Sequence, residues 1–236
     1  MESAYHEVKA VADLANEPPE YREAICKIVA SHAVNELYGA QVFDEPAIAH
    51  APTPYAKWLT CRIAMEEYHH HVRFKGLADE LGIPSAATDP KVKRPLSIFG
   101  FQLKSWPEFC VIKMLADLAE ILQVEDLLTC SFLPLRAIGR LTMPEEKFHA
   151  QFGKKFCEEL CETEEGRREV QAAIDAYAQY LPQFFGAAGS KNNESYRKFG
   201  LKVRKNEEMR EDFLNRARHV VESLGLRFPL LASAGG

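Results

Sequence analysis

Two Glu-x-x-His motifs constrain this chain most, because each lies within the apolar stripe of a long helical pattern. Residues spaced three and four apart share one face of a helix. Glu67 with His70, and Glu146 with His149, continue such stripes, so we expect both pairs to point into the protein interior. The apolar partners are Leu59, Ile63, Phe74, Leu77 and Leu81 for the first pair, and Ile138, Thr142, Gly153, Phe156 and Leu160 for the second.

The first motif overlaps an alternative pair, Glu66 and His69, in the neighbouring register. That register also carries Arg62, Arg73 and Glu80, and it is polar throughout. We therefore predict that Glu66 and His69 lie on the solvent side of the helix, with Glu67 and His70 inside.

Two further acids are predicted to be buried, one on each remaining long helix. Glu36 lies among Ile25, Val29, Ala40 and Phe43 at helical spacing. On the third helix Asp117 is in register with a strongly apolar face, and Glu120, which shares part of that face, stays as the second choice.

Burying several carboxylates in one domain costs several kcal/mol each unless a cation compensates them. One carboxylate from each of two helices, plus Glu-x-x-His from each of two others, is the arrangement that holds two divalent metal ions in a helical bundle. Oxygen and imidazole ligands without cysteine favour two iron ions, with manganese as an alternative. The predicted ligands are Glu36, Glu67, His70, Asp117, Glu146 and His149.

The rest of the 236-residue sequence supports an all-α fold, since helical periodicity recurs and strand alternation is almost absent. Proline and capping signals predict four long helices, followed by two shorter ones at about 164–185 and 207–224 with a polar stretch between them. We expect one domain over residues 1–236, with a core four-helix bundle at about 19–161 and additional C-terminal helices at about 164–225. The long helices are predicted at about 19–43, 55–81, 106–132 and 133–161, joined across 85–105 by a long, basic-tinged connector.

Charge and hydropathy exclude some partners and locations. Twenty-nine Lys and Arg against 34 Asp and Glu give a net charge of −5, which disfavours nucleic acid as a partner. No run of 18 apolar residues is present and the N-terminus is polar, so we predict a cytoplasmic protein without membrane insertion.

Six segments resemble the catalytic subunit of bacterial phenylacetyl-CoA epoxidase, a multicomponent ferritin-like di-iron monooxygenase, and less closely the oxygenase component of benzoyl-CoA epoxidase. The likeness extends from about Tyr21 to Pro229 and is most specific around SIFGF, SW and the late basic segment. The segments are YREAICKIVASHAVNELYG, EEYHHHVRFKGLADELG, LSIFGFQLKSWPEF, MLADLAEI, PEEKFHAQFG and KVRKNEEMREDF.

This resemblance implies a ferritin-like bundle that activates O₂ with two irons and epoxidises or hydroxylates an acyl-CoA-type substrate. It places the iron ligands on the same six residues, favours Asp117 over Glu120, and implies coenzyme A contacts at Lys27, Lys93 or Arg94, and Asn206. The sequence carries no dinucleotide fingerprint or cysteine cluster, so electrons are expected from a separate reductase. A structural partner subunit or a homo-oligomer is also possible within such a system.

Other functions fit the same ligands. A ferritin-like iron oxidase or peroxide reductase would need no organic substrate, and an N-oxygenase would act on an amine. A non-catalytic subunit would be expected to lack ligands, whereas all six are present. The basic stretches at 91–94 and 197–205 are either solvated surface or an anion site.

Overall fold

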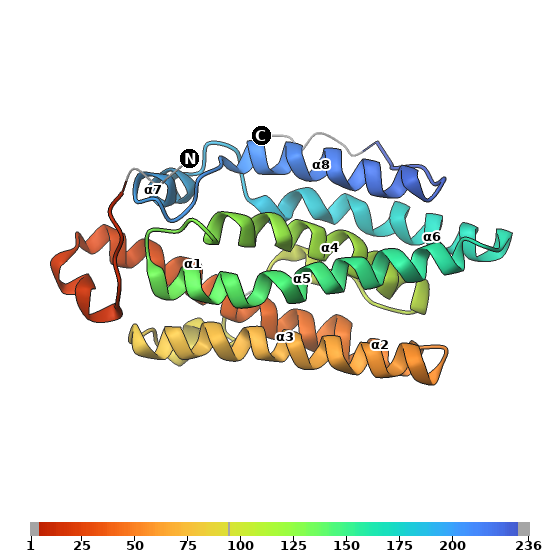
Figure 1. The fold of residues 1–236 in the computed structure, drawn as a ribbon, viewed down its shortest axis with the longest axis horizontal. Coiled ribbons are helices and arrows are strands. Elements are labelled where there is room, and N and C mark those ends of the chain that lie inside the picture. Colours follow the sequence, from red (N-terminus) through yellow and green to blue (C-terminus); the bar gives the residue numbers. More distant parts are fainter. Residues whose placement is uncertain (1–4, 94, 231–236) are drawn as a thin grey trace.

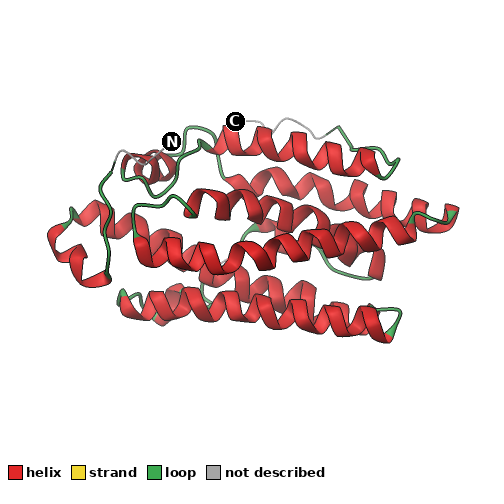
Figure 2. Ribbon diagram, in the orientation of Figure 1, coloured by secondary structure: helices red, strands yellow, loops and turns green. Residues whose placement is uncertain are grey.

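The computed structural model describes residues 5–93 and 95–230, and their regular structure is helical apart from one isolated bridge between Val8 and Phe132. Figure 2 shows long helices lying side by side along one axis. The all-α architecture predicted from the periodicity is confirmed. The main helices are α1 (Pro19–Gly39), α2 (Glu45–His50), α3 (Pro54–Glu80), α4 (Trp106–Leu127), α5 (Leu133–Leu160), α6 (Glu164–Tyr177), α7 (Lys191–Lys198) and α8 (Asn206–Ser223).

The four long helices form two antiparallel hairpins, α1 with α3 and α4 with α5 (Figure 1). In the first hairpin Arg22 donates to the carbonyl of Leu81, and His71 contacts the carbonyl of Ala33 at 2.7 Å, so the residue numbers run in opposite directions. The connector between α3 and α4 crosses from one hairpin to the other and contains two short 3₁₀ turns, Ser85–Ala87 and Ser97–Gly100.

Local signals explain where these helices begin. Proline occupies the first turn of α1, α3, α4 and α5, where its missing N–H removes no helical bond. The hydroxyls of Thr53, Ser105 and Thr163 cap α3, α4 and α6 by accepting a backbone N–H. α5 continues through Pro144 as an unbroken helix.

Two predicted helix ends and one stretch predicted to be non-helical differ from the structure. α4 ends at Leu127 rather than near Phe132, because Cys130 to Phe132 leave the helix to pair with backbone from other segments: Ser131 N–H donates to Gly200 and Val8 N–H donates to Ser131. The predicted helix at 164–185 changes to a 3₁₀ helix at Ala178–Phe185, and α7 lies in a stretch with no predicted helix.

A single π-helical turn, Ala40–Asp44, joins α1 to α2. π turns inside α-helices are rare and frequently lie at functional sites. This one follows Glu36 by one turn and leaves Asp44 buried, 3% exposed, in the interior between the hairpins.

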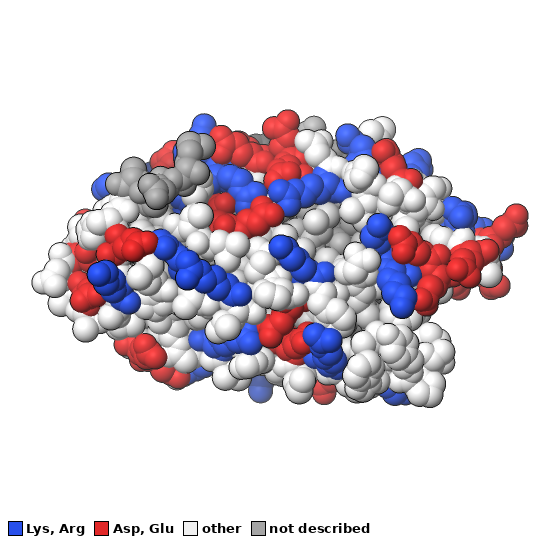
Figure 3. Space-filling view, in the orientation of Figure 1, with Lys and Arg blue, Asp and Glu red and all other residues white. Residues whose placement is uncertain are grey.

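The C-terminal helices α6 and α8 pack on the outer side of α4 (Figure 1). Arg204, just before α8, forms ion pairs with Glu125 and Asp126 of α4 and with Asp212. Arg204 of the late basic segment therefore helps to hold α8 against the bundle. On the face shown in Figure 3, basic and acidic side chains are interspersed.

No helix in the described part of the chain has the length and apolar character required to cross a membrane.

Gly153 fixes the distance between α4 and α5. A Cβ placed there would lie 2.3 Å from the backbone nitrogen of Met114 and 2.6 Å from the carbonyl oxygen of Cys110. The backbones of the two helices therefore touch at this point, one turn from His149 of α5 and one turn from Asp117 of α4.

We predict that Gly153→Ala destabilises the protein by about 1–3 kcal/mol or more, because backbone rather than a flexible side chain has to move. Thermal unfolding measured by circular dichroism should show a melting temperature lower by roughly 5–10 °C. Gly76→Ala is the matched control, since Gly76 is exposed on α3 with nothing within 4 Å of its Cβ position. There the greater helix propensity of alanine should leave stability unchanged or slightly raised. Equal melting temperatures for both variants would contradict the close approach.

Candidate metal centre

The six predicted ligands converge in the middle of the bundle. Each is buried, with exposed fractions from 0% to 8%, and together they come from α1, α3, α4 and α5. Their ligand atoms form two groups in which every atom lies within 4.8 Å of the others. The first group is Glu36, Glu67, His70 and Glu146, and the second is Glu67, Asp117, Glu146 and His149.

Glu67 and Glu146 belong to both groups. A carboxylate has two oxygens, so each of these residues can offer one oxygen to each of two neighbouring ions. Glu36 and His70 would then help to hold one ion, and Asp117 and His149 would help to hold the other. This arrangement suits two adjacent metal ions and is what the paired motifs predicted.

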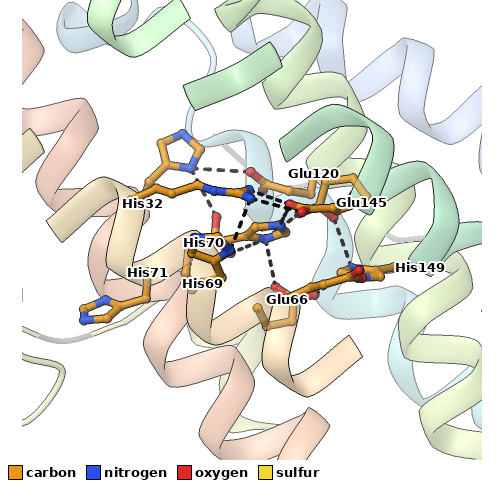
Figure 4. A network of polar contacts seen from close by, with 12 residues as sticks. His32, Glu66, His69, His70, His71, Glu120, Glu145 and His149 are labelled. Carbon is orange, nitrogen blue, oxygen red and sulfur yellow. Dashed lines mark hydrogen bonds and ion pairs between the residues drawn. The ribbon is translucent and has the colours of Figure 1, made fainter. Parts of the chain in front are cut away.

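Both imidazoles turn the same nitrogen toward the carboxylates. Nδ1 of His70 lies 3.1 Å from Oε1 of Glu146, and Nδ1 of His149 lies 3.0 Å from Oε1 of Glu67. The opposite nitrogens point outward: His70 Nε2 is 2.9 Å from Oε2 of Glu145 (Figure 4). Such an outer hydrogen bond fixes the ring and its tautomer with Nδ1 free to bind a metal.

The two outer hydrogen bonds cross between the helices. Glu145 of α5 accepts from His70 of α3, while Glu66 of α3 accepts from His149 of α5 at 2.8 Å (Figure 4). Although burial opposes it, hydrogen bonds from His70 and Arg73 lower the pKa of Glu145 to about 2. Glu145 is therefore a charged acceptor at neutral pH.

This geometry corrects the prediction for Glu66. Its side chain is only 13% exposed and supports His149, whereas His69 is exposed as predicted. Glu145 was missed as well. The signal was present in the sequence, because each Glu-x-x-His is preceded directly by a second glutamate. His71 points away from the cluster in Figure 4.

Glu120, the second-choice ligand, lies beside the cluster in a different group. Its Oε1 is 3.4 Å from Nδ1 of His32, which in turn lies 3.7 Å from Oε1 of Glu36. The His32 ring also stacks on Phe74, with ring centroids 4.6 Å apart. Asp117, not Glu120, shares a group with Glu67, Glu146 and His149.

A buried lysine, which the sequence reasoning did not consider, enters the centre from α4. Lys113 is 3% exposed, and its ammonium lies 2.6 Å from Oε1 of Glu67, 3.0 Å from Oδ2 of Asp117 and 3.3 Å from Oδ1 of Asp44. A single cationic residue within the apolar first half of α4 was the available signal.

Three of the buried acids, Glu146, Asp44 and Asp117, still lack sufficient positive charge in the protein alone. Burial and the charge of Glu67 raise the pKa of Glu146 to about 8, and burial raises the pKa of Asp44 to about 6. Burial also raises the pKa of Asp117 well above its usual value, despite the nearby Lys113. Desolvated acids that gain protons in this way mark a place where a cation would be bound.

Unpartnered atoms at the centre fit that cation. Nδ1 of His70, Nδ1 of His149 and Oε1 of Glu146 are buried and approach charged neighbours at 3.0–3.1 Å, but none of these contacts has the geometry of a hydrogen bond. Buried polar atoms are normally satisfied, so these three require either a ligand or a bound ion. Nitrogen and carboxylate donors of this kind suit divalent iron or manganese.

A cavity of about 400 Å³ connects this centre to the surface. Carboxylates of the cluster line its inner part, and aromatic and aliphatic side chains form much of the remaining wall. Polar residues include Lys27, whose side chain is 47% exposed, so the cavity reaches solvent beside α1. The apolar lining residues include Phe43, Ile98, Phe99, Ile112, Phe184 and Phe185.

The residues predicted to contact coenzyme A are dispersed. Lys27 and Asn206 both line the cavity. Lys93 is half-buried and is not among the residues described along the cavity wall, and Arg94 lies outside the described residues. Lys202, from the late basic segment, lines the cavity and donates to Gln123.

Comparison with known proteins assigns the chain to a protein family. A family described as "Phenylacetic acid catabolic protein" matches residues 7–235. The chain belongs to this family. Over 220 residues it is 27% identical to one of the subunits of the 1,2-phenylacetyl-CoA epoxidase of Escherichia coli (strain K12), an alignment covering 90% of this chain and 71% of the relative. The resemblance seen in the sequence is confirmed, and so is the predicted enzyme class, a di-iron monooxygenase.

A solved structure shares the fold. Protein 19 with aldehyde deformylating oxidase activity from Synechococcus superposes with a TM-score of 0.66 at 18% identity, over 89% of this chain and 93% of that one. This match confirms the predicted ferritin-like fold class.

We predict that Glu66→Ala and Glu145→Ala each weaken binding of divalent metal roughly 10- to 100-fold, because each leaves a ligand imidazole without its outer hydrogen bond. Competition with a fluorescent chelator measures the affinity. Glu80→Ala, which removes an exposed acid from α3, is the control and should bind metal as the unmodified chain does. Unchanged affinity in both test variants would show that the crossed pairs do not orient the histidines.

Proposed function

We propose that this protein is an oxygenase that binds two iron ions through the six clustered residues and oxidises an acyl-CoA-type substrate, by epoxidation or hydroxylation. The observation that carries the proposal is the continuity between the carboxylate–histidine centre and a partly apolar cavity that opens beside Lys27. Bound iron would supply the reduction of dioxygen and the transfer of one oxygen atom to carbon.

The chain's own residues give this chemistry its selectivity. Phe43, Phe99 and Ile112 present an apolar surface beside the carboxylates, which suits the hydrocarbon part of a substrate and excludes water from it. The elongated, polar coenzyme A part would extend toward the opening, where Lys27 and Asn206 are placed to meet it. The name of the Escherichia coli relative supports this substrate class.

Electrons have to come from another protein in this proposal, because oxygen insertion consumes two electrons and two protons for the second oxygen atom. A separate reductase is therefore the proposed partner. A structural subunit is a further proposed partner, supported by the relative's description as one subunit of an epoxidase and by exposed apolar residues along α3, namely Tyr55, Trp58, Met65 and Val72. The cytoplasmic location stays a prediction.

We predict a metal content near two ions per chain after anaerobic reconstitution with Fe(II), measured by elemental analysis. Glu67→Ala, which removes a residue shared by both groups, should abolish binding of both ions. Manganese uptake to the same level would fit the same ligands. One ion per chain in the unmodified protein would overturn the dinuclear assignment.

We also expect the reconstituted protein, supplied with a reductase, to consume O₂ when given acyl-CoA thioesters. A panel of aromatic and aliphatic thioesters, followed by mass spectrometry for a gain of one oxygen atom, identifies the acyl group. O₂ consumption driven by Fe(II) alone, with no oxidised thioester, would instead favour the iron oxidase alternative. Oxidation of an amine in place of a thioester would favour an N-oxygenase.

Lys27→Ala should raise the apparent KM for the thioester roughly three- to tenfold, since a charge-assisted contact to phosphate at a partly exposed position is lost. Metal content should be unchanged. Lys75→Ala is the control, because Lys75 forms a comparable surface ion pair one turn along its helix, as Lys27 does with Glu23. An unchanged KM for Lys27→Ala would remove this residue from the substrate site.

A further inference from the structure

Lys113 lies where the second group of candidate ligands converges. Its ammonium is within 3.0 Å of both Glu67 Oε1 and Asp117 Oδ2, which are members of that group. The same Oε1 of Glu67 is 3.0 Å from Nδ1 of His149. An ion bound by Asp117 and His149 would need these donor atoms, so the ammonium and the ion compete for them.

The other group meets Lys113 only through the shared residue Glu67, whose second oxygen, Oε2, faces the other end and lies 3.4 Å from Nδ1 of His70. The ion pairs that Lys113 forms are with Glu67, Asp117 and Asp44, while Glu36 approaches the two imidazoles of His32 and His70. Among the residues that the structure describes, a lysine is therefore placed against the ligands at one end of the centre only. The two metal positions are unequal before any metal binds.

Asp44 offers Lys113 a second anionic partner that is outside both groups. Its Oδ1 lies 3.3 Å from the ammonium, and the residue is 3% exposed. The formal charges are consistent with a movement of the Lys113 ammonium from the ligand carboxylates to Asp44 when metal binds. The carboxylates of Glu36, Glu67, Asp117 and Glu146 balance two divalent ions, which leaves Lys113 and Asp44 to neutralise each other.

We propose that Lys113 is an internal counter-cation that occupies the second metal position in the metal-free protein and is transferred to Asp44 when the second ion binds. Metal uptake is then ordered. The first ion binds at the Glu36 and His70 end, and the second binds more weakly because it has to displace the ammonium from Glu67 and Asp117. This inference rests on the proposed dinuclear site and adds a role for two residues that are not ligands.

The test measures Mn²⁺ binding to the metal-free 236-residue chain. Calorimetry gives the affinities, and electron paramagnetic resonance separates isolated from spin-coupled ions. Wild type should show two unequal affinities. Lys113→Met keeps the side-chain volume without the charge, so the second ion should bind about tenfold more tightly or better, as expected when no charge-assisted hydrogen bond has to be broken. Without Mn²⁺, this variant should melt roughly 5–10 °C lower, because the buried carboxylates lose their counter-charge.

Asp44→Asn should act in the opposite direction. With no anion to receive it, the ammonium leaves Glu67 and Asp117 less readily, and the second ion should bind more weakly than in wild type. In the double variant Lys113→Met/Asp44→Asn this weakening should disappear, because without the Lys113 ammonium no anion is needed at position 44 to receive it. Lys154→Met is the control for replacing a lysine, because it removes only a surface ion pair with Glu158.

The outcomes separate this inference from the function on which it rests. Wild type that binds no Mn²⁺ and no Fe(II) would overturn the dinuclear centre itself. Two ions bound with unchanged affinities in Lys113→Met and in Asp44→Asn would leave the centre intact and overturn the role of Lys113. If Lys113→Met does not fold, Asp44→Asn alone still decides, because a second-ion affinity equal to or above that of wild type contradicts the exchange.

Discussion

Desolvation of carboxylates at the centre of the bundle is the constraint on which the structure depends. Glu36, Glu67, Asp117 and Glu146 are removed from water almost completely, and a buried charge without a partner costs more than a domain's net stability can absorb. The apolar stripes force these residues inward, so the protein has to supply compensation around them. The histidines and Lys113 packed against the carboxylates supply part of that compensation.

The compensation is arranged in pairs that cross between helices. His70 and His149 face the carboxylates with Nδ1 and are held from behind by Glu145 and Glu66 of the opposite helix. Arg73 and Arg62 extend these pairs outward by binding Glu145 and Glu66 in turn. α3 and α5 are therefore linked on either side of the centre, which fixes the positions of the imidazoles before any metal is bound.

The C-terminal part of the chain completes the cavity rather than the centre. Tyr177, Phe184, Phe185 and Asn206 line the cavity, and all follow the four-helix core in sequence. Arg204 forms ion pairs between the start of α8 and acids on α4. This part of the basic segment therefore stabilises the packing of α8 instead of forming a solvated basic surface.

The sequence alone determined the helical fold and the members of the cluster, because 3.6-residue periodicity records directly which side chains face inward. It placed Glu67 and His70, rather than His69, on the inner face of α3, and it anticipated that two helices would contribute one acid each and two others a Glu-x-x-His motif. Which side chains face inward is a property of a single helix, and it is encoded by the spacing of apolar residues along the sequence. The ends of α4 and α6 were predicted less well, since α4 stops where distant backbone at Val8 and Gly200 offers other hydrogen bonds.

Only the tertiary structure decided what lies across the gaps between helices. Glu66 belongs to a polar stripe by periodicity, yet it supports His149 because α5 passes over that side of α3. Lys113 and Asp44 are distant in sequence and meet only because a π turn and α4 bring them to the same end of the centre. Such contacts depend on the relative rotation and separation of helices, which close packing at residues such as Gly153 sets and which no single-helix pattern contains.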